Sequence, residues 1–162
     1  IDATGCEVFA FDPTPRSVEY MKTEAAQNPH LSFFPLGLWH RKETLKFFAP
    51  EDPGHVSHSV VNLQNTSDYF EAPCDRLSSI MSDLGHSRID MLKLNVEGAQ
   101  YAVLDSILED DVPIGVLSVA FDQPASPLRI YRTVRALQRH GFDLVKVDRW
   151  AYTFVANEGP PL

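Results

Sequence analysis

The chain has 162 residues, of which 44% are hydrophobic and 22% are charged. This length and composition fit one globular domain that can bury a core. The net charge of -8, without any extended basic segment, argues against a nucleic-acid partner and against a membrane-surface binder. No segment reaches membrane-spanning length. The two cysteines, Cys6 and Cys74, lack metal-ligand spacing and fit a cytoplasmic protein.

The first predicted elements follow the order strand, helix, strand. Residues 6–11 are a buried strand between Gly5 and Pro13. Residues 15–27 are a helix with proline at its first position. Residues 31–36 are a second strand, so this part of the sequence predicts a parallel crossover unit.

The middle of the chain is less regular. Residues 43–63 alternate, break at a Pro- and Gly-containing stretch, and resume, which predicts a hairpin or irregular insertion with a loop around 50–58. A short extended piece is expected at 70–76. Residues 76–85 then predict a helix that ends at a C-cap glycine, Gly85.

The last part of the chain alternates strands and helices. The pattern predicts strands at 89–96, 113–121, 143–148 and 151–156, with helices at 99–108 and 127–140. The strand at 89–96 is expected to be central, and the last two strands to be antiparallel. The whole predicts an open, mostly parallel α/β sheet with helices on both faces, forming one domain over residues 1–156 with a tail at 157–162.

An acidic residue, Asp12, ends the first strand, and Pro13 prevents the strand from continuing. In open α/β sheets ligands bind at the carboxyl ends of strands. An ionised carboxylate accepts hydrogen bonds only, which suits the two donors of a ribose diol. The alternative for Asp12 is an N-cap of the following helix, a role that Thr14 or Ser17 could also take.

Two further groups of side chains have candidate roles. His58 and Ser59, in the loop with His55, are candidates for substrate contact, and two histidines are too few for a structural zinc site. No metal site is therefore predicted. Four arginines recur at spacings of three and four on one helix face, and we interpret them as a solvated stripe, with a phosphate-binding face as the alternative: Arg129, Arg132, Arg135 and Arg139.

Three segments, in this order, resemble the FkbM family of S-adenosylmethionine-dependent methyltransferases: "VFAFDPTP", "LGLW" and "RIDMLKLNVEGAQYAVL". The resemblance covers about residues 5–156, and its most specific piece is "IDMLKLNVEGAQ". It implies a Rossmann-like methyltransferase sheet, S-adenosylmethionine as cofactor and a hydroxyl as the usual methyl acceptor.

The resemblance also implies roles for particular residues. Asp12, with Pro13, would bind the ribose diol, and Gly37 and Leu38 would lie near the adenine. Three residues at the end of the strand 89–96 would face the methyl donor and the acceptor, as catalytic candidates: Lys93, Asn95 and Glu97. Asn95 would also contact the cofactor. The alternatives are a surface lysine for Lys93 and a helix N-terminal acid for Glu97.

The chain departs from the family pattern in three ways. Asn95 stands where the family usually has aspartate, and Gln100 where it usually has glutamate, so Asn95 cannot act as a general base. The family's first strand and Gly-rich loop have no counterpart before residue 6. We therefore expect a fragment whose sheet has a gap between the strands 6–11 and 89–96, or else an inactive domain.

Two functions follow as hypotheses. The first is an S-adenosylmethionine-dependent O-methyltransferase domain acting on a small-molecule or glycan acceptor, and the second is a non-catalytic domain of the same fold used in binding or assembly. A nucleotide-binding module with another cofactor is a weaker third. An open gap in the sheet also suggests the hypothesis of a homodimer.

Overall fold

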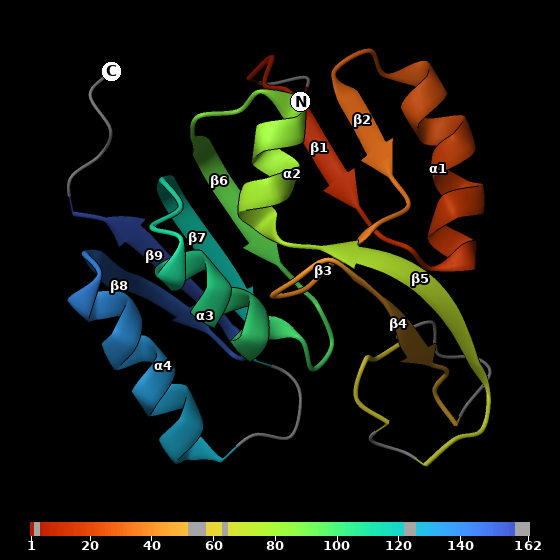
Figure 1. Cartoon of the computed structure of the whole chain (residues 1–162). Helices are drawn as coiled ribbons and strands as arrows, with labels where there is room; N and C mark the ends of the chain where they lie inside the picture. The colour runs from red at the N-terminus through yellow and green to blue at the C-terminus, as the bar shows by residue number, and fades with distance from the viewer. Residues whose placement is uncertain (2–3, 52–57, 63–64, 122–125, 158–162) are drawn as a thin grey trace. The chain divides into compact units, whose positions relative to one another are not determined.

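The computed structural model describes residues 1, 4–51, 58–62, 65–121 and 126–157. The chain divides into two compact units, Ile1–Asp75 and Arg76–Leu162, each of which we describe by itself. The strands form three sheets, and Figure 1 labels the elements. The prediction of a single domain over 1–156 stays a prediction.

The first unit begins with the predicted crossover. Strand β1 (Val8–Phe11) and strand β2 (Leu31–Phe34) pair in parallel, joined by helix α1 (Pro15–Gln27). The helix bounds match the prediction, because proline at the first position and Asn28-Pro29 at the end mark both ends. The last residues of the two strands, Phe11 and Phe34, are register partners whose rings stack at 4.9 Å.

A second, three-stranded sheet completes this unit. It consists of β3 (Gly37–Leu38), β4 (Glu43–Phe48) and β5 (Tyr69–Asp75) in the order β3-β5-β4, with β3 parallel and β4 antiparallel to β5. The strand predicted over 31–36 ends two residues early, at Phe34, because Pro35 lacks the N–H that a ladder needs. Of the two alternatives predicted for 43–63, the hairpin is wrong in its main partner, since β4 pairs with β5, and the irregular insertion stays a prediction. Only an isolated bridge joins Phe48 to Ser59, and residues 52–57 of the predicted loop lie outside the described part.

The second unit has a four-stranded sheet in the order β6-β7-β9-β8. Strands β6 (Ile89–Leu94) and β7 (Ile114–Ala120) are parallel, and β9 (Ala151–Ala156) runs antiparallel to β7 and to β8 (Phe142–Asp148). The antiparallel C-terminal edge is thus confirmed. The helices are α2 (Leu77–Leu84), α3 (Gln100–Glu109) and α4 (Pro127–Arg139). Gly85 ends α2 with φ of 72°, as its predicted C-cap role requires.

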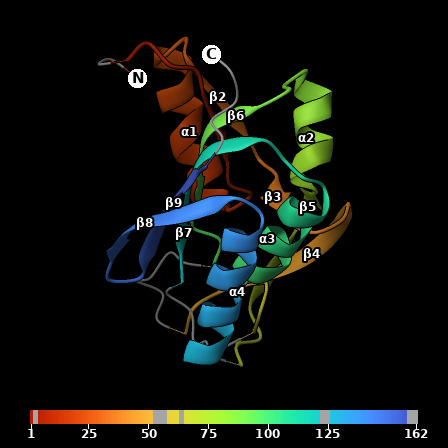
Figure 2. The same cartoon turned by 90° about the vertical axis from the view of Figure 1, so that its left-hand side faces the viewer.

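One detail of the predicted sheet differs, and two stay predictions. The described strand pairs are three parallel and three antiparallel, so the sheets are mixed and not mostly parallel. Strand β6 pairs with β7 alone among the described strands and ends the strand order of its sheet, so a central place is not confirmed. Figures 1 and 2 both show α2, α3 and α4 on one face of this sheet. Helices on both faces were expected of the whole predicted sheet, and this stays a prediction.

Apolar side chains from every layer of the second unit form its core. The residues with 0% exposure come from α3, β7, α4 and β9: Val103, Leu104, Leu117, Val119, Leu137 and Phe154. In the part of the chain that the structure describes, no helix has the length and hydropathy to span a membrane.

Candidate functional site

Asp12 follows β1 directly and lies at the carboxyl end of the β1–β2 pair. Its backbone N–H donates to the carbonyl oxygen of Phe34 at 3.2 Å, which extends the ladder by one bond. One carboxylate oxygen, Oδ1, accepts from the Thr14 backbone N–H at 2.8 Å, and Oδ2 accepts from the Ser17 hydroxyl at 2.6 Å. The carboxylate is therefore held in one orientation by the start of α1.

These two bonds bear on both interpretations of Asp12. The N-cap residue of α1 is Thr14, whose side chain makes no capping bond, so Asp12 supports the helix start from two residues upstream. A carboxylate has about four lone-pair sites, and two are used by Thr14 and Ser17. The donor set of a ribose diol fits the two that remain, and the half-buried position leaves the carboxylate within reach of a ligand.

Gly37 and Leu38 form β3, three residues beyond the end of β2. Gly37 is buried, and a Cβ built on it would lie 2.6 Å from the Cys74 Sγ and 3.0 Å from the Phe47 ring. Packing therefore explains why this position lacks a side chain. Burial raises the pKa of the Cys74 thiol to about 11, with the nearby Glu43 carboxylate as a second cause.

The substrate candidates His58 and Ser59 belong to the first unit. The Ser59 backbone N–H and C=O bridge to Phe48 at 3.1 and 2.9 Å, and the His58 ring lies edge-on to Phe70 at 5.1 Å. Both residues therefore lie beside β4 and β5. His55, named with them, is outside the described residues.

The predicted catalytic residues lie at the carboxyl end of β6. Lys93 is exposed in the strand, opposite Ser118 of β7, and Asn95 is the first residue after it. Glu97 is half-buried in the turn that leads to α3. Since α3 begins at Gln100 and has no acid in its first turn, Glu97 precedes the helix and is not a first-turn acid.

The structure thus groups the predicted residues into two sets. Asp12, Pro13, Gly37, Leu38, His58 and Ser59 belong to the first unit, and Lys93, Asn95 and Glu97 to the second. Within each unit the main candidates lie at the carboxyl ends of parallel strands, where ligands bind in α/β sheets. Among the described residues, no group of three or more His, Cys, Asp or Glu side chains could hold a metal ion.

Sequence reasoning missed two polar side chains at the start of α3. Gln100 is 1% exposed, and neither its Oε1 nor its Nε2 has a hydrogen-bond partner among the described residues. Tyr101 is 6% exposed, and its hydroxyl also lacks a partner in this part of the chain. The Arg129 guanidinium lies over the Tyr101 ring at 3.9 Å. The sequence signal that could have indicated Gln100 was its departure from the family pattern. No sequence signal indicated the contact between Arg129 and Tyr101.

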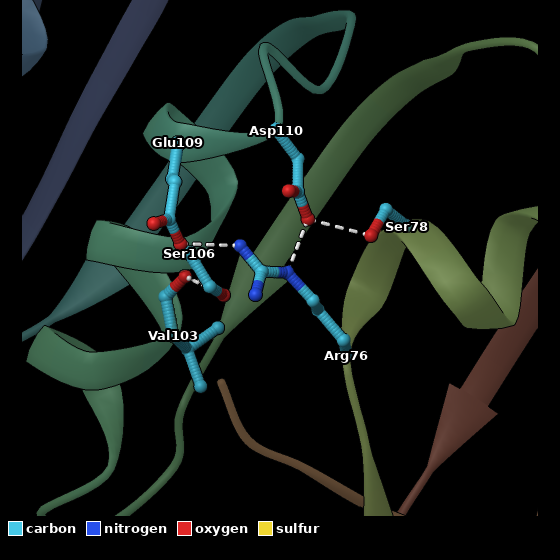
Figure 3. Close-up of polar contacts among 6 residues, drawn as sticks. All are labelled: Arg76, Ser78, Val103, Ser106, Glu109 and Asp110. Atoms are coloured by element: carbon cyan, nitrogen blue, oxygen red, sulfur yellow. Dashed lines mark hydrogen bonds and ion pairs between the residues drawn. The ribbon is translucent and has the colours of Figure 1, made fainter. Parts of the chain in front are cut away.

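A polar network joins α2 to the end of α3 (Figure 3). Arg76 donates through Nε to Asp110 and, at 2.5 Å, through its terminal nitrogen to Glu109. The Ser78 hydroxyl donates to the same Asp110 oxygen at 2.6 Å. Hydrogen bonding by Arg76 is the main reason that the pKa of Asp110 is lowered. These bonds hold α2 to the end of α3 within the second unit, and they involve none of the predicted site residues.

The mixed α/β arrangement, with polar side chains at the carboxyl ends of its parallel strands, is consistent with a methyltransferase fold. A family model described as the methyltransferase FkbM domain matches residues 2–148. The chain therefore belongs to the FkbM methyltransferase domain family, and the recognition from its sequence is confirmed.

Two curated relatives are similar over part of the chain. Both are described as probable methyltransferase-like protein 24, from Rattus norvegicus at 29% identity and from Homo sapiens at 28%, over 108 residues. Each alignment covers 67% of this chain but only 23% of the relative. No solved structure matches the chain.

Proposed function

We propose that the chain is the methyl-transfer part of an S-adenosylmethionine-dependent methyltransferase that acts on a hydroxyl group of a sugar-like or other small acceptor. Family membership supports methyl transfer. The observation that carries the cofactor assignment is Asp12, a carboxylate fixed at the end of a parallel strand with acceptor capacity remaining.

In this proposal Asp12 accepts from the ribose hydroxyls, while Pro13, Gly37 and Leu38 line the adenosine side. When bound, S-adenosylmethionine supplies a methyl group on a positively charged sulfur, which becomes a neutral thioether once the methyl carbon bonds to the acceptor oxygen. Asn95 is an exposed residue directly after β6, and the partial negative charge of its amide oxygen attracts the positively charged sulfur of the cofactor.

The acceptor hydroxyl must lose its proton as the new bond forms. Glu97 is the only carboxylate in the segment from Lys93 to Gln100, so we assign it as the group that takes this proton. Lys93 donates a hydrogen bond to the acceptor, and His58 and Ser59 are proposed substrate contacts. Alignment of the two reactants by these groups supplies most of the rate.

The test is calorimetric titration of S-adenosylhomocysteine, which carries the ribose without the sulfonium, into the 162-residue chain. Asp12→Asn keeps an oxygen for the Thr14 N–H but removes the charge, and we expect it to weaken binding at least about tenfold, as for loss of charge-assisted bonds. Ser17→Ala is the matched control: it removes the other local bond and keeps the carboxylate.

Equal affinity for the wild type and Asp12→Asn would refute the ribose assignment, and absence of binding would refute the cofactor assignment for this chain. Asn95 and Gln100, where the family usually has acids, favour the non-catalytic domain as the second candidate. Binding of the cofactor without transfer to any hydroxylated acceptor would support that alternative.

A further inference from the structure

Four side chains gather at one end of the second unit's sheet, beyond the carboxyl ends of β6 and β7. Tyr101 belongs to the first turn of α3, which follows β6, and Phe121 follows β7 directly. Their rings are 5.7 Å apart, and Phe121 meets the Tyr152 ring edge-on at 5.1 Å. Arg129, in the first turn of α4, completes the group by stacking on Tyr101.

Arg129 has the features of a preorganised anion-binding group. Its guanidinium is fixed over an aromatic face, which restrains a side chain that is otherwise flexible. Helix α4 contains no acidic residue, and within the described part of the chain no hydrogen bond or ion pair uses the Arg129 guanidinium. In a chain of net charge -8, an arginine held in place without an acidic partner among the described residues favours a binding role.

Two polar side chains at the start of α3 add hydrogen-bonding capacity that the described residues leave unused. The Gln100 amide can donate two hydrogen bonds and accept others, and the Tyr101 hydroxyl can do both. Burial is the main cause that raises the pKa of Tyr101, so its hydroxyl keeps its proton at neutral pH. Each buried polar atom without a partner costs free energy, and hydroxyl groups, which both donate and accept, match this set.

We propose that Gln100, Tyr101 and Arg129 form the acceptor subsite of this domain, and that the acceptor is a hydroxylated acid whose carboxylate or phosphate binds Arg129. This inference rests on the proposed function and names its substrate class. Arg129 is exposed, so the oxyanion of an acceptor can reach its guanidinium while the guanidinium stays on the Tyr101 ring.

The experiment measures binding of three probes to the 162-residue chain, with and without S-adenosylhomocysteine: glucuronate, glucose 6-phosphate and glucose. We expect one of the two anionic probes to bind at least about tenfold more tightly than glucose. The tighter of the two identifies the oxyanion. The side-chain amide signals of Gln100 in nitrogen-15 spectra should shift with that probe.

Variants separate this site from the general charge of α4. Arg129→Gln should remove the preference for the anionic probe, whereas Arg132→Gln, which removes the same charge one turn along the helix, should change affinity less than about twofold. Tyr101→Phe keeps the ring under Arg129 and removes only the hydroxyl. Gln100→Met should weaken binding yet raise the melting temperature, because it removes buried polar atoms without partners.

Equal binding of glucose and both anionic probes, no binding of either anionic probe, or equal losses in the two arginine variants would overturn the proposal. These results are separate from those for the cofactor. Asp12-dependent binding of S-adenosylhomocysteine without anionic-probe binding refutes only this subsite, and the reverse pattern refutes only the cofactor assignment.

Discussion

Gly37 is the position where the structure predicts the sharpest cost of adding one methyl group. A Cβ there would lie 2.6 Å from the Cys74 Sγ and 3.0 Å from the Phe47 ring, against ordinary contact distances of about 3.5–4.0 Å. The backbone of Gly37 does not have the positive φ that favours glycine, so Gly37→Ala tests space alone. Overpacking of this kind costs about 1–3 kcal/mol.

A double-mutant cycle assigns that cost to its cause. Cys74→Ala removes the sulfur atom that the new methyl group would meet, leaving the Cys74 Cβ at 3.7 Å. We expect the double variant to lose less unfolding free energy than the two single variants lose in sum, with a coupling energy of about 0.5–3 kcal/mol. Urea unfolding followed by circular dichroism measures all four proteins, and Cys6→Ala, at an exposed cysteine, is the control.

Two results would refute this reasoning. If Gly37→Ala unfolds at the same urea concentration as the wild type, the sheet accommodates the methyl group and packing does not explain the glycine. If the two substitutions are additive, the contact with Cys74 is not the source of the cost. A loss of cofactor binding without a loss of stability would instead favour the adenine contact proposed for Gly37.

Three further predictions follow from the buried thiol and the polar network. The pKa of the Cys74 thiol is raised to about 11 in the folded chain, so its contribution to stability is complete below about pH 9 and is lost as the pH rises through 11. The free energy of unfolding of the wild type should therefore fall by about 2–3 kcal/mol over this window relative to Cys74→Ala. Urea unfolding at each pH measures this difference. Iodoacetamide should modify Cys6 but not Cys74 in the folded chain at pH 8, and modify both in urea, as mass spectrometry would show; rapid modification of Cys74 would contradict its burial. The lowered pKa of Asp110 means that its stabilising effect is present above the ordinary carboxyl pKa and is lost as the pH falls through the folded-state value. Asp110→Asn should therefore lower the melting temperature at pH 7 and reduce its acid dependence, whereas Asp105→Asn, at an exposed position within α3, should leave the melting temperature at pH 7 unchanged.

Local signals explain the parts of the fold that the sequence predicted well. Proline at the first position begins α1 and α4, Ser126 caps α4 with its hydroxyl at 3.3 Å from the Arg129 N–H, and Gly85 ends α2 in the left-handed conformation. These signals depend on residues within one turn of each helix end, so they can be interpreted without the rest of the chain. The family resemblance likewise depends on contiguous segments.

Strand partners and side-chain contacts were decided by tertiary structure. The alternation in 43–48 predicted a strand. Its pairing with Tyr69–Asp75 joins residues that are distant in the sequence, such as Glu43 and Cys74, and no local pattern encodes such a pair. The lack of room for a side chain at Gly37 was likewise decided by tertiary structure, because the atoms that a Cβ would meet belong to other strands.

The four arginines of α4 show most clearly what the sequence alone determined and what the tertiary structure decided. Their spacing determined that they share one face of a helix, which the sequence predicted correctly. Only the packing of α4 near the start of α3 distinguishes Arg129, whose guanidinium lies on Tyr101, from Arg132, which has the same chemistry one turn away. Spacing along a helix depends on its 3.6-residue period, whereas an aromatic partner depends on which elements the sheet brings together.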